Sequence, residues 1–302
     1  MENKKIILPL IITLSLLIAG CAQQQKQETK SPFVGGSQGI VAKFEPIGVV
    51  EAGIGTVFDT EKFPVELTLK NKGEEDVPAG KAKIQLLGIS VNDFTGIVGE
   101  KTSAKNIEKT STTTPEGGDE IIDFGDAKYT VPISGTYYDI NIFAKYTYSY
   151  KTYVNVPNVC FKGDVTSKEI CTIEEAKTVF FSGAPIQVKK ATEKLAGAGI
   201  IAIEFEIENV GGGRSTKPSE PFNQQYNQIK YVLTPSSETS KWECRSGGQV
   251  DEARLVGDKA TVRCKLLNPL EKSALYTKQI GLEISYDYES LVQQTVRIKK
   301  AG

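Results

Sequence analysis

The cysteines are the residues of this sequence with the clearest chemistry open to them. There are five cysteines and no histidine, so the Ser-His-Asp and Cys-His arrangements of nucleophilic enzymes are excluded. Cys21 lies in the N-terminal segment, apart from the other cysteines. The remaining four are an even number, which favours disulfides in an oxidising compartment. Of the three possible pairings the local one is favoured, and it joins Cys160 to Cys171 and Cys244 to Cys264. A zinc site is disfavoured because no Cys-x-x-Cys spacing occurs.

Paired carboxylates are the other groups that could act on a substrate. The two acidic clusters near expected turns are Glu74, Glu75 and Asp76, and Glu116, Asp119 and Glu120. Glycoside hydrolysis needs only two acids about 5 to 9 Å apart, and calcium would use the same oxygen ligands, although no Asp-x-Asp-x-Asp-Gly loop supports it. Exposed acids are common at turns, so we expect neither a metal nor catalysis from these clusters.

Composition argues against several further classes of protein. The glycine-rich run 211–213 is not followed by Lys-Ser or Lys-Thr, so it does not indicate a phosphate-binding loop. Lys and Arg number 36 against 37 Asp and Glu, and no stretch combines basic residues with interleaved aromatics. We therefore expect no cofactor and no nucleic-acid partner.

The first twenty residues have the order of a signal peptide. Lys4 and Lys5 precede an uncharged run at 6–18, and Ala19 and Gly20 are small residues of the kind found before a cleavage site. The apolar run is much shorter than the roughly 20 residues that cross a bilayer as a helix. We expect residues 1–20 to be removed as a signal peptide.

The stretch 17–21, Leu-Ile-Ala-Gly-Cys, resembles the lipobox of prokaryotic lipoproteins. The resemblance implies that Cys21 is lipidated and that the membrane is a partner through this anchor, since two acyl chains suffice for stable attachment. Residues 21–37 begin with a polar segment and are expected to be a flexible tether. The predicted location is the cell surface, on the extracytoplasmic face of the membrane. The alternative is an ordinary secretory peptide with an incidental cysteine.

Alternation of apolar and polar residues is the dominant signal after the tether. Such alternation buries one side of each segment and leaves the other in water, as in strands of antiparallel sheets. The expected strands are 39–44, 63–71, 82–89, 121–124, 129–133, 140–148, 185–189, 201–209, 228–234, 242–245, 260–266 and 280–288. Short strands separated by Gly, Pro, Asn and Asp are typical of an immunoglobulin-like β-sandwich.

Four patterns in the first half recur in the same order in the second half. Segment 63–73 aligns with 201–211, and both end in Asn-x-Gly, at Asn71 and Asn209, where a turn is favoured. Three further patterns occur in the same order in each half. They are Gly-Asp with a later Thr-Val, an alternating strand that ends in Tyr-x-Tyr, and Val-x-Val or Val-x-Ile. Collinear matches of this kind predict a duplication. A single large all-β domain is the alternative.

The predicted fold class is all-β, with two tandem immunoglobulin-like antiparallel β-sandwich domains at 38–157 and 184–302. Residues 158–183 are expected to form a linker that holds the Cys160–Cys171 loop. Within this linker, 172–175 has the spacing of a capping box, which predicts one short helix.

The alternating strands that end in Asn-x-Gly, carried by 65–73 and 203–211, resemble the immunoglobulin-like modules of archaeal and bacterial surface proteins, including the CARDB group related to cell adhesion. The resemblance implies a binding or spacer module without catalysis. The second copy departs from the pattern after Gly211, where a long polar loop follows, so the equivalence of the two loops is open.

Two kinds of residue could contact a ligand. The polar loops 99–119 and 211–227 are placed where recognition residues usually lie on a rigid scaffold, with a solvated or glycosylated loop as the alternative. The tyrosine ladders could bind a sugar or a partner surface, although core or cross-strand packing is favoured. The tyrosines in question are Tyr146, Tyr148, Tyr286 and Tyr288.

The expected function is a non-catalytic adhesion, scaffold or envelope-assembly module with an envelope protein or glycan as partner. One alternative is a solute- or glycan-binding lipoprotein of a transport system, which would normally have α/β lobes. The other is a carboxylate-based glycoside hydrolase.

Overall fold

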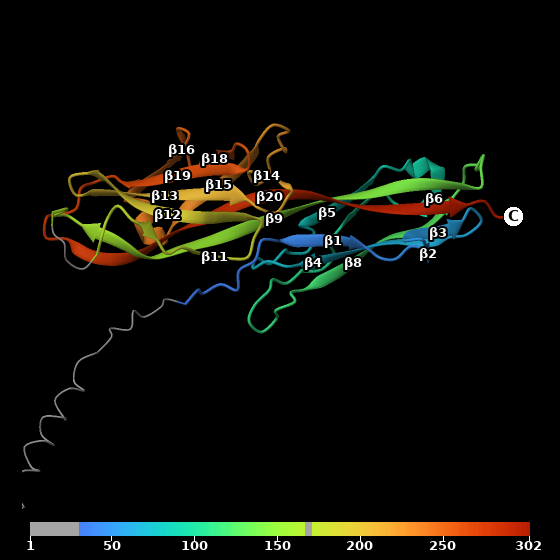
Figure 1. Ribbon diagram of the computed structural model, residues 1–302, viewed down its shortest axis with the longest axis horizontal. Coiled ribbons are helices and arrows are strands. Elements are labelled where there is room, and N and C mark those ends of the chain that lie inside the picture. The colour runs from blue at the N-terminus through green and yellow to red at the C-terminus, as the bar shows by residue number, and fades with distance from the viewer. Residues whose placement is uncertain (1–29, 167–170) are drawn as a thin grey trace, which may run out of the picture. The chain divides into compact units, whose positions relative to one another are not determined.

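The computed structural model describes residues 30–166 and 171–302 (Figure 1). Within it, Ser31–Gly302 form one compact unit. The expected signal peptide at 1–20 and the expected lipidation site Cys21 lie outside the described residues. No helix in the described part of the chain is long and apolar enough to cross a membrane.

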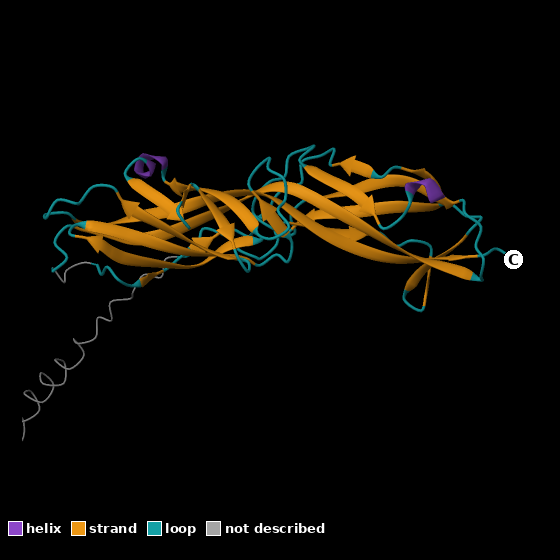
Figure 2. Cartoon of the chain, turned by 90° about the horizontal axis from the view of Figure 1, so that it is seen from above, coloured by secondary structure: helices purple, strands orange, loops and turns teal. Residues whose placement is uncertain are grey.

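The fold is all-β, as the alternation predicts, and Figure 2 shows strands in layers joined by loops. The strands up to residue 162 are β1 (Ile40–Phe44), β2 (Val49–Glu51), β3 (Ile54–Phe58), β4 (Phe63–Asn71), β5 (Ala82–Leu87), β6 (Phe94–Ile97), β7 (Glu100–Thr102), β8 (Asp119–Tyr129) and β9 (Tyr137–Lys162). The later strands are β10 (Ala176–Lys177), β11 (Phe180–Phe181), β12 (Ile186–Gly197), β13 (Ile200–Asn209), β14 (Arg214–Thr216), β15 (Asn227–Thr234), β16 (Trp242–Ser246), β17 (Gln249–Val250), β18 (Glu252–Leu255), β19 (Lys259–Leu266) and β20 (Leu275–Lys299). Among the described residues, the helical elements are the short 3-10 helix η1 (Val91–Asp93) and the single turn α2 (Ser236–Thr239).

The core follows the alternation of the strands. In β4 every second side chain is buried, and Val65, Leu67 and Leu69 have no exposed surface. In β13 the side chains of Ile203 and Phe205 are also fully buried. Burial of each such side chain contributes roughly 1.5 to 3 kcal/mol to the free energy of folding. This burial stabilises the packing of one sheet on another.

The described strands form three sheets, and the order of strands repeats. One sheet has the order β1-β4-β8-β6, and a second contains the run β12-β13-β19-β16. The third sheet has the order β18-β15-β20-β9-β5-β7, so β7-β5-β9 corresponds to β18-β15-β20. One topology is therefore present twice. We call the two copies the N-terminal repeat (β1 and β4–β9) and the C-terminal repeat (β12, β13, β15, β16 and β18–β20).

The two repeats share the third sheet. Strands β9 and β20 pair antiparallel from Tyr137 with Lys299 to Lys162 with Leu275, and Figure 1 shows them running side by side. The last residues of β20 then pair in parallel with β3. The end of β20 therefore lies between β9 of the N-terminal repeat and β3, so the sandwiches expected at 38–157 and 184–302 are joined through one sheet.

An approximate twofold axis relates the repeats within this sheet. Ser149 and Asp287 occupy equivalent positions 138 residues apart, and they pair with each other across β9 and β20. On either side of them Tyr148 pairs with Tyr288 and Tyr150 pairs with Tyr286. The Ser149 hydroxyl donates a hydrogen bond to Oδ1 of Asp287 at 2.6 Å.

The expected linker 158–183 is built into the sheets. Its first residues extend β9, and β10 and β11 pair with β12 and β9. The short helix expected after Thr172 is wrong: residues 172–175 form no helix, and Glu174 has a φ of 66°. Strand pairing explains the difference, because Ala176 and Lys177 extend beside Thr192 and Ala191 instead of continuing a helical turn.

The end of the expected tether is also anchored. The backbone N–H groups of Val34 and Gly35 donate to the carboxylate of Glu74 at 2.9 and 2.8 Å. The carbonyl of Gly36 accepts a hydrogen bond from the side chain of Gln187 at 2.6 Å. Residues 34–36 of the predicted 21–37 tether therefore belong to the folded unit, since a carboxylate and a buried carboxamide hold their backbone.

Candidate functional site

The Asn-x-Gly turns of the two repeats are one hydrogen-bonded arrangement that occurs twice. In the N-terminal repeat, Oδ1 of Asn71 accepts hydrogen bonds from the backbone of Gly73 and from the hydroxyl of Tyr150, both at 3.1 Å. That hydroxyl accepts a further bond from the backbone N–H of Glu75 at 3.2 Å. The arrangement ties the turn after β4 to the facing strand β9.

The C-terminal repeat has the same contacts 138 residues further along. Oδ1 of Asn209 accepts from the backbone of Gly211 at 3.2 Å and from the hydroxyl of Tyr288 at 2.9 Å. The Tyr288 hydroxyl accepts from the N–H of Gly213 at 2.8 Å. A Cβ on Gly211 would lie 2.4 Å from that hydroxyl, so only glycine allows the close approach. The Asn-x-Gly pattern therefore has a structural role, because its asparagine side chain fixes the turn.

The tyrosine ladders lie inside the protein. Tyr146, Tyr148, Tyr286 and Tyr288 are 7%, 2%, 0% and 2% exposed. The rings of Tyr148 and Tyr288 are 5.8 Å apart, and burial raises the pKa of the Tyr288 hydroxyl to about 12. A ligand does not reach these side chains, so the ligand-contact prediction is wrong and the packing alternative describes them.

The acidic cluster after β4 anchors backbone and side chains. Glu74 accepts a hydrogen bond from the N–H of Gly183 at 2.6 Å, in addition to those from residues 34 and 35. Glu75 accepts a hydrogen bond from the hydroxyl of Tyr153 at 3.1 Å, and burial raises the pKa of its carboxyl. Asp76 accepts one from the N–H of Lys109 at 2.8 Å. These three carboxylates are occupied by contacts within the protein.

In the second acidic cluster, Glu116 and Glu120 also bind neighbouring groups of the protein. Glu116 forms ion pairs with Lys70 and Lys72 at 2.9 and 3.0 Å, and their ammonium groups lower the pKa of its carboxyl to about 2. Glu120 is buried and accepts a hydrogen bond from the N–H of Ala104 at 2.8 Å. Asp76, Glu116 and Glu120 therefore hold loop 99–119 in place. Among the described residues no group of three or more Cys, Asp and Glu side chains is arranged to hold a metal ion.

Both predicted disulfides are present. Cys160 is bonded to Cys171, with 5.7 Å between Cα atoms, and Cys244 is bonded to Cys264 across β16 and β19. The local pairing is therefore confirmed. It closes short loops, which reduces the entropy of the unfolded chain.

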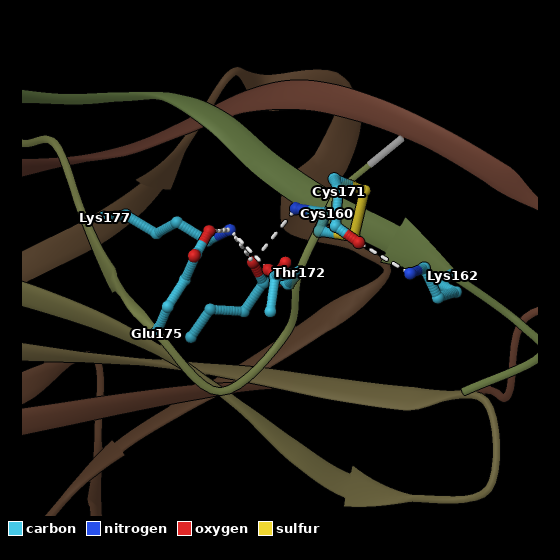
Figure 3. Close-up of polar contacts among 7 residues, drawn as sticks. Cys160, Lys162, Cys171, Thr172, Glu175 and Lys177 are labelled. Atoms are coloured by element: carbon cyan, nitrogen blue, oxygen red, sulfur yellow. Dashed lines mark hydrogen bonds and ion pairs between the residues drawn. A yellow bond between two sulfur atoms is a disulfide. The ribbon is translucent and has the colours of Figure 1, made fainter. Parts of the chain in front are cut away.

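A buried ion pair lies beside the first disulfide (Figure 3). The carboxylate of Glu193 has no exposed surface and lies 3.0 Å from Nζ of Lys177. It also accepts a hydrogen bond from the N–H of Cys160 at 3.0 Å. Lys177 donates in addition to Glu175 at 2.6 Å and to the carbonyl of Thr172 at 2.7 Å. These contacts are internal to the protein and hold the segment after the disulfide against β12.

The two polar loops border the same groove. It has a volume of about 600 Å³ and is lined by side chains from β5, β7 and β9 together with Phe222 of loop 211–227. Its lining includes Lys83, Gln85, Lys101, Thr102, Lys145 and Thr147. Loop 99–119 contributes β7, and loop 211–227 contributes Phe222, so both loops expected to carry recognition residues reach this surface.

A buried carboxylate also lines this groove. Glu289 is 8% exposed, and its carboxylate accepts a hydrogen bond from Nη2 of Arg214 at 2.5 Å and lies 3.8 Å from Nζ of Lys145. A second hollow, lined by Gly212, Arg214 and Leu291, shares Lys145 and Glu289 with the groove. The two hollows therefore adjoin at the junction of the repeats.

The lysines on the strands were not predicted as site residues. Lys83 and Lys145 stand on the outward-facing positions of alternating strands, where a charged residue is ordinary. Register places Lys83 beside Thr147 and Gln85 beside Lys145. The sequence alone does not show that these residues are neighbours, because their proximity depends on which strands pair and in which register.

No protein-family model matches the chain, and no curated protein matches it. Among solved structures, the secreted serine protease VesC from Vibrio cholerae is similar at 12% sequence identity, with a TM-score of 0.21. The match covers 82% of this chain and 50% of the protease chain, so this chain spans about half the length of that protein. A TM-score this low does not support a shared fold or activity.

Proposed function

We propose that the protein is a non-catalytic lipoprotein, anchored through Cys21 on the extracytoplasmic face of a prokaryotic membrane, that binds an envelope component through loops on a β-sandwich scaffold. The observation that carries the proposal is the groove between loops 99–119 and 211–227. Recognition residues commonly lie on loops that a rigid framework positions, and here the loops come from different repeats but border one surface.

The disulfides support a location outside the cytoplasm. Cys160–Cys171 and Cys244–Cys264 both form, and disulfides persist in oxidising compartments. The order of a basic end, an apolar run and a small-residue site before Cys21 supports export and lipidation of that cysteine.

The chemistry of the chain supports binding over catalysis. The sequence has no histidine, and carboxylates of both acidic clusters engage neighbouring groups of the protein. Binding to an envelope component needs only the shape and charge of the groove, which the described side chains supply.

Mass spectrometry of the mature protein tests the anchor. We expect residues 1–20 to be absent and Cys21 to carry acyl chains, and we expect Cys21→Ser to abolish the lipid mass and release the protein from membranes. An unmodified Cys21 on a protein that stays in the cytoplasm contradicts the proposal.

Crosslinking on intact cells tests the binding role. A photo-crosslinker placed at Thr102, in the groove, is expected to capture an envelope component, whereas the same group at exposed Lys62 serves as the matched control. Equal capture from both positions, or capture from neither, contradicts a binding role for the groove.

A further inference from the structure

The groove at the junction of the repeats has an excess of positive charge. Its cations are Lys83, Lys101 and Lys145, and its anions are Glu100 and Glu289. Glu289 is already neutralised by the nearby guanidinium of Arg214. Neither Lys83 nor Lys101 has an ion-pair partner among the residues that the structure describes, so only Glu100 offsets their ammonium groups in the groove.

Strand β5 in the floor of the groove has no free edge to which an extended peptide could add. A peptide that joins a sheet uses unpaired backbone groups at a strand edge. Here β5 is hydrogen-bonded to β7 on one side and to β9 on the other. At β5 the groove therefore offers a ligand side chains, and the unpaired strand edge at this end of the sheet belongs to β7.

The side chains of the groove suit a sugar polymer. Phe222 provides an apolar ring, and Gln85, Thr102 and Thr147 provide amide and hydroxyl groups. Polar groups that fix the orientation of a ligand, beside an aromatic side chain, are usual components of a ligand site. Carbohydrates present apolar ring faces and hydroxyl groups together, and a carboxylate on the sugar would satisfy the lysines.

From this arrangement we propose that the groove binds an acidic polysaccharide, whose carboxylates pair with Lys83 and Lys101 and whose sugar rings pack on Phe222. The inference rests on the proposed function and names the class of ligand for the same groove. The neighbouring hollow at Arg214 extends the surface along which a polymer would lie.

The experiment measures binding of purified mature protein to polygalacturonate by calorimetry, with dextran as the neutral polymer and polyglutamate as the acidic peptide. We expect binding to polygalacturonate that weakens as salt is added, because salt screens exposed charges. We expect no binding to dextran and weaker binding to polyglutamate. The double variant K83E/K101E is expected to lose roughly tenfold or more in affinity, which corresponds to about 1.4 kcal/mol.

The control variant K62E/K300E makes the same change of charge at exposed lysines away from the groove. It is expected to bind within about twofold of the wild type, since distant exposed charges are screened. Phe222→Ala, which leaves the charge unchanged, is expected to weaken binding to polygalacturonate. Thermal unfolding of each variant verifies that it is folded.

Several outcomes would overturn the inference: no binding of polygalacturonate by the wild type, equal losses in K83E/K101E and K62E/K300E, or polyglutamate binding as tight as polygalacturonate. The last outcome would identify an acidic protein segment as the ligand. If Cys21 carries lipid and crosslinking at Thr102 captures an envelope component while the lysine variants bind normally, the proposed function stands and the inference about the acidic polysaccharide fails.

Discussion

The hydroxyl of Tyr150 donates a hydrogen bond to Oδ1 of Asn71 at 3.1 Å and accepts one from the backbone N–H of Glu75. The C-terminal repeat has the same relationship between Tyr288 and Asn209, at 2.9 Å. Each bond joins the turn after one strand to a strand that is 79 residues away along the chain. The repeats are thus equivalent in their internal contacts as well as in their strand order.

Removal of one of these hydroxyl groups should destabilise the protein. We expect Tyr150→Phe and Tyr288→Phe each to lower the free energy of unfolding by about 1 to 3 kcal/mol, because a backbone N–H is left without its partner. The two losses should be similar, since the contacts are equivalent. Denaturant unfolding measures them, with Tyr138→Phe as the control at a half-exposed ring. Losses no larger than that of the control would show that the hydroxyls do not stabilise the turns.

The shared sheet predicts that the repeats unfold together. Val296 and Ile298 have no exposed surface and lie in the part of β20 that pairs with β3. Deletion of residues 291–302 should therefore unfold the N-terminal repeat, although it removes only the end of the chain. Hydrogen exchange at the amides of Val65 and Leu67 measures this loss of protection.

A shorter deletion, of residues 300–302, is the control and should leave the amide protection unchanged. The intact protein is expected to show a single cooperative unfolding transition. Two separate transitions, or normal protection in the long deletion, would establish independent domains.

The disulfides should differ in what they protect. On the chain-entropy model we expect C160S/C171S and C244S/C264S each to cost about 3 kcal/mol in stability. Only the first is expected to expose residues 171–177 to proteases, because Cys160–Cys171 holds that segment beside β12. Limited proteolysis followed by mass spectrometry measures the difference. Identical cleavage patterns in the two variants would contradict a local role for Cys160–Cys171.

The Glu193 carboxyl should make stability depend on pH. Burial raises its pKa above the ordinary value of 4.5, and the N–H of Cys160 and the ammonium of Lys177 oppose this only in part. The folded state therefore retains this proton at pH values where the unfolded chain has released it. The contribution to stability is full below pH 4.5 and is lost as the pH rises through the folded-state pKa.

Glu193→Gln removes this titration and keeps an oxygen that accepts from Cys160. The wild type is expected to be most stable relative to the variant near pH ~4 and to lose this advantage towards neutral pH. Denaturant unfolding across this range measures the difference. An advantage that grows with pH would show that the ion pair with Lys177 outweighs the cost of burial.

The strands and disulfides could be predicted from sequence because their signals are local. Alternation at 63–71 and 201–209 marks which side chains face a core, and these segments form β4 and β13. Cys160 and Cys244 each have a partner close along the chain. The helix expected after Thr172 is absent because pairing of β10 with β12 overrides a weak local signal.

The order of residues was enough to establish the all-β class, the duplication of patterns and the pairs of cysteines, since period-two alternation and short spacing are properties of nearby residues. Three further features depend on the folded arrangement: the end of β20 lies between β9 and β3, Tyr148 and Tyr286 are buried, and Lys83 and Lys101 line one groove with Phe222. Strand pairing joins residues far apart in the chain, and the face of a sheet that is covered depends on which strands meet. Local patterns do not specify that choice.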